Sequence, residues 1–184
     1  MSIQKEEINT EGGFSTDRVK QIIPEENKEE MKNILLLKPT TFEEQKKEFE
    51  KLLKQIKTNN IALIIVDGMT MLYRLELGDA IQNKQEDKIQ NVNRELAKQL
   101  RTLAEISRKQ NIPIIATNQV YYKFGKEEAN MVGGDLLKYW SKCIIELTNE
   151  RGKKKLILRK HRSLPENELS FIITNSGIKK RGWI

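Results

Sequence analysis

The chain has one cysteine, few aromatic residues and no long hydrophobic run. Cys143 is the single cysteine among 184 residues, which excludes an internal disulfide and predicts a reducing, cytoplasmic location. Because its segment Cys143-Ile144-Ile145 is apolar, we expect this thiol to be buried in the core. The longest apolar run, Ile61 to Val66, has six residues, far below the roughly 18 that a membrane span needs. The sequence therefore predicts a soluble protein with no membrane partner.

Positive charge is concentrated near the end of the sequence. The net charge is +7, yet residues 151–184 carry ten Lys or Arg against two Glu, whereas residues 1–150 carry 23 Lys or Arg against 24 Asp or Glu. This asymmetry favours a polyanionic partner such as nucleic acid. A solvated basic face would give the same composition.

Apolar periodicity predicts alternating strands and helices up to residue 116. Short apolar runs predict strands at Ile34–Leu37, Ile61–Val66 and Ile112–Ala116, and the first of them is expected to be covered on both faces. Thr41 and Glu44 form a capping-box pattern at the start of a helix that runs to about Thr58. The apolar residues of this helix recur at helical spacing and are expected to face the core: Phe42, Phe49, Leu52, Leu53 and Ile56. A second helix is predicted by the helical spacing of Ile89, Val92, Leu96, Leu100 and Leu103, after a polar loop. Such alternation is typical of parallel βαβ units.

The pattern changes beyond residue 130. Gly133-Gly134-Asp135 opens a short helix that contains Trp140, and three strand-like runs follow at 143–148, 155–160 and 169–174, with Arg151-Gly152 as a hairpin turn. The predicted fold class is α/β, with a mainly parallel twisted sheet flanked by helices and an antiparallel C-terminal extension. Residues 1–184 are expected to form a single domain.

Three polar positions follow predicted strands, where ligands bind in open α/β sheets. Asp67 ends the apolar run 63–66 in a Walker B pattern, in which a carboxylate holds Mg²⁺ or its water; simple capping of the next segment is the alternative. Asn118 and Gln119 could hydrogen-bond a γ-phosphate or its attacking water. Glu11, before Gly12-Gly13, could act as a base that orients water.

Together these motifs, in this order and spacing, resemble the RecA and RadA recombinase family, and most closely its short archaeal RadB branch. The resemblance covers the chain from about Ile8 onward, and it rests on the segments 10–15, 66–70, 117–120, 133–134, 139–142 and 160–163. It implies a RecA-like core, with Glu11 as the water-activating glutamate, Asp67 as the Walker B aspartate and Asn118-Gln119 as the amide pair before a DNA-binding loop. It also implies ATP and Mg²⁺ as cofactors.

The chain departs from the family pattern at its beginning. None of its ten glycines falls into the GxxxxGK[ST] spacing that cradles phosphates, and only ten residues precede Glu11. The opening Met1–Glu7 is too polar for the buried strand that the family would place there, and Asn9 stands where Asp is usual. We therefore expect the front of the domain to be missing and ATP binding to be weak or lost.

The resemblance also implies two DNA-contacting loops, at about 75–87 and 121–132. The first is not basic and is a poor candidate. The second interleaves aromatic and basic residues that could stack bases and neutralise phosphates, or else pack on the sheet: Tyr121, Tyr122, Lys123, Phe124 and Lys126. Lys160 and Arg162 are expected to reach a neighbouring subunit's nucleotide or to bind DNA. His161 is expected to be structural or solvated.

The leading hypothesis is an accessory protein of homologous recombination and DNA repair that binds single-stranded or branched DNA. One alternative is a DNA-dependent ATPase, at most a weak enzyme, whose phosphate site a neighbouring subunit completes. Another is a non-enzymatic partner of a RadA-type recombinase or a Holliday-junction resolvase that docks through a bare sheet edge. Self-association is compatible with each.

Overall fold

The computed structural model describes residues 4–10, 13–58, 60–122 and 129–182. In it the chain divides into two compact units. The first comprises Met1–Phe14 and Glu30–Trp140, and the second comprises Ser15–Glu29 and Ser141–Ile184. The expectation that residues 1–184 form a single domain stays a prediction.

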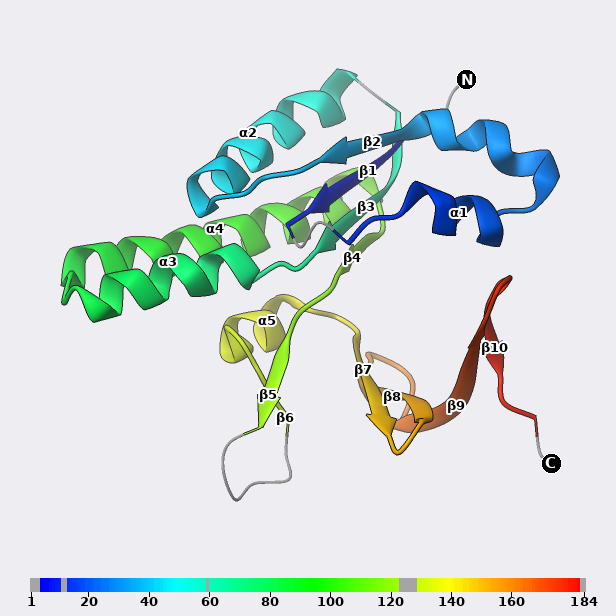
Figure 1. Ribbon diagram of the computed structural model, residues 1–184. Coiled ribbons are helices and arrows are strands. Elements are labelled where there is room, and N and C mark those ends of the chain that lie inside the picture. Colours follow the sequence, from blue (N-terminus) through cyan, green and yellow to red (C-terminus); the bar gives the residue numbers. More distant parts are fainter. Residues whose placement is uncertain (1–3, 11–12, 59, 123–128, 183–184) are drawn as a thin grey trace. The chain divides into compact units, whose positions relative to one another are not determined.

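The first unit is an α/β structure around a parallel sheet. The sheet has the strand order β2-β1-β3-β4, and each neighbouring pair is parallel. Figure 1 shows α3 and α4 side by side and the β5–β6 hairpin extending away from β4. The elements of this unit are β1 (Gln4–Asn9), β2 (Ile34–Leu37), α2 (Phe42–Thr58), β3 (Ile61–Asp67), α3 (Met71–Gln82), α4 (Glu86–Gln110), β4 (Ile114–Ala116), β5 (Val120–Tyr122), β6 (Ala129–Met131) and α5 (Gly134–Trp140).

The core of this unit forms where α2 and α4 meet the sheet. Leu52 of α2, Ile64 of β3 and Leu96 of α4 are completely buried. Each such side chain contributes about 1.5 to 3 kcal/mol relative to full exposure. The helical and strand periodicities of the sequence therefore predict the correct inward faces of α2, β3 and α4. Leu53 is an exception, since 43% of it is exposed.

The predicted capping box at the start of α2 is present in a shifted form. The Glu44 backbone N–H donates to Thr41 Oγ1 at 3.1 Å, as the motif requires. The Glu44 carboxylate, however, accepts hydrogen bonds from the backbone N–H and hydroxyl of Thr40, both at 2.8 Å. The hydrogen bond from the Thr40 backbone N–H, followed by that from the Thr40 hydroxyl, lowers the pKa of Glu44 below its ordinary value.

Three expectations for the first unit are wrong. The polar opening of the chain does form a strand: β1 pairs with β2 on one side and β3 on the other, so main-chain hydrogen bonds outweigh its polar sequence. The segment after Asp67 is not a polar loop, because α3 occupies Met71–Gln82. In addition, β2 lies at the sheet edge and is only half buried, although it was expected to be covered on both faces.

The second unit is an antiparallel sheet with one helix. Its strand order is β10-β9-β8-β7, which confirms the antiparallel C-terminal extension. Arg151 (φ 49°) and Gly152 (φ 80°) form the predicted turn between β7 and β8, and two successive positive φ values are those of a type I′ hairpin. The elements are α1 (Thr16–Ile22), β7 (Ile144–Glu150), β8 (Lys153–Lys160), β9 (Asn167–Thr174) and β10 (Gly177–Lys180); a 3-10 segment, η1 (Glu25–Asn33), leads back to the first unit.

Helix α1 is attached to the turn between β9 and β10. The Arg18 guanidinium donates to the backbone oxygens of Thr174, at 2.6 Å, and Asn175, at 2.8 Å. Ile22 approaches Gly177, where an added Cβ would lie 3.5 Å from Ile22 Cγ2. The helix is thereby part of the second unit although it lies far from the sheet in sequence.

Cys143 is exposed, so the prediction of a buried core thiol is wrong. The residue directly precedes β7 and lies outside the paired strands, where no neighbouring strand covers it. In the part of the chain that the structure describes, no helix combines the length and the apolar character needed to cross a membrane.

Candidate functional site

The carboxyl end of β3 places Asp67 at the edge of the sheet, as predicted. Asp67 is the last residue of the strand and is half buried, and Gly68 follows with φ 84°, a value that favours glycine. Val66, one residue earlier, is completely buried. The strand thus fixes the backbone of Asp67 in the core while its carboxylate stays accessible.

Thr117 holds the Asp67 carboxylate in place. The Thr117 hydroxyl donates to Asp67 Oδ1 at 2.7 Å and accepts from the Gly68 backbone N–H at 2.8 Å. The backbone of the same residue donates to Val66 O at 2.9 Å and accepts from Met69 N at 3.0 Å. Thr117 has no predicted role in the sequence, although its place as the first polar residue after β4 is a signal that identifies it.

Thr10, which follows the other neighbouring strand, β1, also holds Asp67 and Gly68 in place. We call these two residues the Asp67 turn. Its backbone N–H and its hydroxyl donate to Asp67 O, at 3.0 and 2.8 Å, and the hydroxyl also contacts Gly68 O at 2.9 Å. Thr10 is buried, with 8% of it exposed. The predicted base Glu11 is the next residue along the chain, but it lies outside the described residues.

Asn118 connects the end of β4 to the base of the β5–β6 hairpin. Its Oδ1 accepts a hydrogen bond from the Thr70 hydroxyl, and its Nδ2 donates to Val132 O at 3.0 Å. Val132 N in turn donates to Gln119 O at 3.3 Å. The Asn118 amide therefore has internal partners at both ends, whereas Gln119 is exposed. A role for either amide toward a phosphate stays a prediction.

The hairpin presents part of the predicted DNA-contacting segment. Tyr121 of β5 lies opposite Asn130 of β6, and 42% of Tyr121 is exposed. An aromatic side chain in that position is not packed into the sheet. The other residues of the predicted DNA-contacting segment, Lys123, Phe124 and Lys126, lie outside the described residues, as does the side chain of Tyr122.

The predicted cations of the second unit are exposed at the end of β8. Lys160 is the last residue of β8, and Arg162 follows in the connection to β9. Between them, His161 Nδ1 accepts hydrogen bonds from the backbone N–H groups of Ser163 and Leu164, both at 3.1 Å. His161 thus stabilises a turn, as expected. A role for Lys160 and Arg162 toward nucleotide or DNA stays a prediction.

The residues around Asp67 fit one half of a magnesium nucleotide site. Asp67 and Thr117 offer the hard oxygen atoms that Mg²⁺ and its water molecules prefer. Within the described ranges, however, no three His, Cys, Asp or Glu side chains gather where they could hold a metal ion. The sequence also contains no GxxxxGK[ST] loop to bind phosphates. Asp67 and Thr117 therefore suit a Mg²⁺ ion that further ligands, beyond these two residues, bind at the same time.

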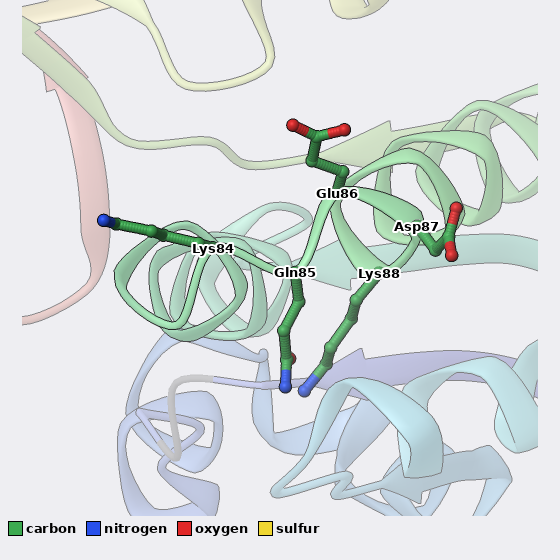
Figure 2. Close-up of a pocket in the computed structure, with 5 residues that line it drawn as sticks. All are labelled: Lys84, Gln85, Glu86, Asp87 and Lys88. Atoms are coloured by element: carbon green, nitrogen blue, oxygen red, sulfur yellow. The ribbon is translucent and has the colours of Figure 1, made fainter.

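A shallow hollow at the α3–α4 turn does not provide a second site. Figure 2 shows that Lys84, Glu86 and Asp87 point in three different directions, whereas Gln85 and Lys88 point the same way, so the five side chains around the hollow do not converge on one point. Lys88 instead binds Glu76 at 2.8 Å, and this contact raises the pKa of the Lys88 ammonium group. Most of the segment 75–87, which the resemblance places in a first DNA-contacting loop, lies in α3, so its prediction as a loop is wrong.

Comparisons with known proteins identify the family of the chain. The family model described as Rad51 matches residues 4–181. The chain belongs to the Rad51 family. Within this family it is similar to the DNA repair and recombination protein RadB of Methanococcus maripaludis strain C7, at 43% identity over 94% of this chain and 76% of that protein. The RadB of Methanocaldococcus jannaschii is 40% identical over 94% of this chain and 77% of its own length.

A solved structure supports the same assignment within the Rad51 family. The crystal structure of the RadB recombinase matches with a TM-score of 0.75 and 33% sequence identity, over 96% of this chain and 78% of that chain. The RecA-like fold class and the RadB branch of the family, both predicted from sequence motifs, are thereby confirmed. The predicted roles of individual residues remain predictions.

The Thr117 hydroxyl provides a test of how the Asp67 turn is stabilised. Replacing Thr117 by valine leaves the buried Gly68 N–H without its acceptor, and we expect a loss of roughly 1 to 3 kcal/mol in the free energy of unfolding. Urea denaturation would measure it. Thr117→Ser keeps the hydroxyl and serves as the matched control. Equal stability of the two variants would show that the hydrogen bond does not stabilise the turn.

Proposed function

We propose that this chain is a DNA-binding accessory protein of homologous recombination and DNA repair. Support comes from its membership of the Rad51 family and from its relatives, which are named DNA repair and recombination protein RadB. The observation that carries the proposal is the β5–β6 hairpin, which exposes Tyr121 and is attached through Asn118 to the end of β4. The proposed substrate is single-stranded or branched DNA, whose unpaired bases an exposed aromatic ring can stack upon.

The structure of the hairpin base favours this role over core packing. Asn118 and Gln119, which precede β5, are hydrogen-bonded to Val132, which follows β6, so the two strands leave the sheet from a fixed point. Val120 and Tyr121 are each more than 40% exposed, at 45% and 42%. Because the start of the hairpin is fixed, its exposed aromatic and aliphatic side chains lose little conformational entropy when they bind nucleobases.

Removing the Tyr121 ring tests the proposal. We expect Tyr121→Ala to weaken single-stranded DNA binding by about 1 to 3 kcal/mol, or roughly 5- to 150-fold, because one stacking contact is lost. Fluorescence anisotropy with a labelled oligothymidine at low ionic strength would measure the affinity. Tyr139→Ala is the matched control, since Tyr139 of α5 is 72% exposed but lies outside the hairpin.

Two results would count against the proposal. If the unchanged protein does not bind single-stranded or branched DNA at low salt, the DNA-binding function is wrong. If Tyr139→Ala weakens binding as much as Tyr121→Ala does, the hairpin is not the binding element.

Nucleotide binding is proposed to be weak or lost in this chain. Asp67, oriented by Thr117, would hold Mg²⁺, and Glu11 would orient water; together with the metal, ATP would supply phosphoryl-transfer chemistry. The absence of the GxxxxGK[ST] loop argues that these residues alone do not retain the phosphates. An ATPase would need phosphate-binding groups that residues 1–184 do not contain. The proposed partners beyond DNA are a RadA-type recombinase, a Holliday-junction resolvase or a second copy of this chain.

A further inference from the structure

The antiparallel sheet of the second unit has one apolar face and one polar face. Cross-strand partners lie on the same face of a sheet, whereas neighbours along a strand lie on opposite faces. The register therefore places six apolar side chains together on one side, which we call the apolar face: Leu147, Leu156, Leu169, Phe171, Ile173 and Ile178. The opposite side, the polar face, carries the salt bridges of Lys155 with Glu168 and of Arg159 with Glu146.

The apolar face is exposed to water. Leu147 is 66% exposed, and Ile173 and Ile178 are 59% and 70% exposed. Ile173 and Ile178 lie between Phe171 and the β9–β10 turn, which α1 contacts, so α1 does not cover this face. A contiguous patch of exposed apolar side chains marks a surface for a partner, because leaving it in water costs free energy.

The two faces also differ in charge. The three carboxylates within the paired strands, Glu146, Glu150 and Glu168, all lie on the polar face. Two lysines, Lys154 and Lys180, lie on the apolar face, and neither forms a salt bridge with a carboxylate in the described part of the chain. A partner that covers the apolar face therefore meets positive charge without a compensating acid.

These two lysines lie on either side of Phe171, in the middle of β9. Lys154 of β8 and Lys180 of β10 are both direct cross-strand partners of Phe171. Their backbones are two strand spacings or about 10 Å apart, which matches the diameter of an α-helix, about 10 to 12 Å. A helix along β9 would bury its apolar stripe on Leu169, Phe171 and Ile173 and place its two flanks beside the lysines.

The charges favour an acidic helix over other occupants of the apolar face. A second copy of this face would bring two more lysines and no carboxylate, so like charges would meet. A lipid surface attracts clusters of basic residues, whereas here single lysines lie on either side of one strand. Carboxylates on the two flanks of a helix would pair with one lysine each, while the apolar stripe fills the space between them.

We propose that the apolar face binds an amphipathic α-helix of a partner protein, with glutamate or aspartate on both flanks of its apolar stripe. The helix lies along β9, with one flank beside Lys154 and the other beside Lys180. This mode differs from strand addition at a sheet edge, because side chains of the partner, and not its backbone, make the contacts. It does not depend on the proposed DNA binding by the β5–β6 hairpin.

Two synthetic peptides test the chemistry of the partner. Both are labelled, have about 18 residues and carry leucines at helical spacing; the first has glutamate and the second has lysine on both flanks of the leucine stripe. We expect the full chain to bind the glutamate peptide with a micromolar dissociation constant and the lysine peptide about tenfold more weakly, because repulsion replaces two ion pairs. Fluorescence anisotropy at about 0.1 M salt would measure both affinities.

Two neighbouring isoleucines of β9 test which face binds the peptide. Ile173 lies on the apolar face and is 59% exposed, whereas Ile172 lies on the polar face and is 43% exposed. We expect Ile173→Ser to weaken binding of the glutamate peptide roughly 5- to 30-fold, because the peptide no longer buries an apolar side chain there. Ile172→Ser is the matched control and should change the affinity less than about twofold.

Reversing the charges of the two lysines tests their part in recognition. We expect the double variant Lys154→Glu with Lys180→Glu to bind the lysine peptide more tightly than the glutamate peptide. A purely structural effect of the substitutions would weaken both peptides and would not reverse the preference. The double variant Lys153→Glu with Lys179→Glu is the matched control, since it changes net charge equally on the polar face and should keep the preference for glutamate.

Four results would overturn the inference, and none of them involves DNA. The first is an affinity for the glutamate peptide weaker than about 1 mM. The second is an equal loss of affinity in Ile172→Ser and Ile173→Ser, which would place the peptide elsewhere. A dimer in sedimentation velocity that Ile173→Ser dissociates would make a second copy the occupant. Binding to vesicles of phosphatidylcholine and phosphatidylglycerol, with loss of that binding in Ile173→Ser, would make a lipid surface the occupant.

Discussion

Replacing Leu96 by alanine is expected to lower the free energy of unfolding by about 3 to 5 kcal/mol. Leu96 of α4 is completely buried in the core of the first unit. The Leu96 Cδ2 atom also packs against Gly133, directly before α5, since a Cβ added to Gly133 would lie only 3.3 Å from Leu96 Cδ2. Truncation would remove apolar contacts and leave a cavity that closely packed neighbours cannot fill.

Urea denaturation of Leu96→Ala beside a matched exposed leucine would measure this effect. Leu75 of α3 is 59% exposed, so Leu75→Ala should change stability by no more than about 0.5 kcal/mol. A loss below about 1 kcal/mol for Leu96→Ala would contradict the packing of α4 against α5 and the sheet. Comparable losses for both variants would place Leu75 in contact with the core as well.

The second large effect is expected from a buried pair of glutamines between α2 and α4. Gln45 Nε2 donates to Gln99 Oε1 at 2.8 Å and contacts Met69 O, beside the Asp67 turn, at 3.4 Å. Gln45 is completely buried and Gln99 is 1% exposed. Gln45→Leu leaves the Gln99 oxygen without a donor, and we expect a loss of roughly 1 to 3 kcal/mol in the free energy of unfolding.

A double-mutant cycle would show whether the hydrogen bond causes that loss. Gln45 Oε1 and Gln99 Nε2 have no protein partner among the described residues, so the combined Gln45→Leu and Gln99→Leu change removes four buried polar atoms at once. The double variant should therefore regain the stability lost by either single variant. Gln90→Leu, at an exposed position of α4, is the control. Additive losses in the double variant would contradict this explanation.

The parts of the fold that follow from the sequence are those with one clear apolar stripe or run. Leu52, Ile64 and Leu96 lie where their spacing predicts, and Arg151-Gly152 forms the predicted turn because a type I′ hairpin needs two left-handed residues. Helix α3 was missed for the opposite reason. It buries Leu72 and Tyr73 yet exposes Leu75 and Ile81, so its apolar residues show no single face.

Strand β1 and Cys143 show that tertiary context can reverse a local pattern. The polar residues before Ile8 pair on both sides because β2 and β3 supply main-chain partners, which composition does not reveal. Cys143 is exposed because the apolar segment that contains it enters the sheet only at Ile144.

The candidate site was predictable at the level of strands but not of hydrogen bonds. Asp67 follows from an apolar run that ends in a carboxylate, and such ends meet at one edge of a parallel sheet. The roles of Thr10 and Thr117 depend on which strands lie beside β3, and this register appears only in the structure. The same holds for Asn118, whose partner Val132 is 14 residues further along the chain.

The central position of β1 has a consequence for the order in which the sheet assembles. On the ribosome, β1 emerges before both of its neighbours, since β2 begins at Ile34 and β3 ends at Asp67. The backbone N–H and C=O groups of β1 that face β3 therefore stay without their strand partners until more than fifty further residues have been synthesised. Pairings over such sequence separations form slowly, so the Asp67 turn is completed late, when Thr10, which follows β1, and Thr117, which follows β4, form their hydrogen bonds to it.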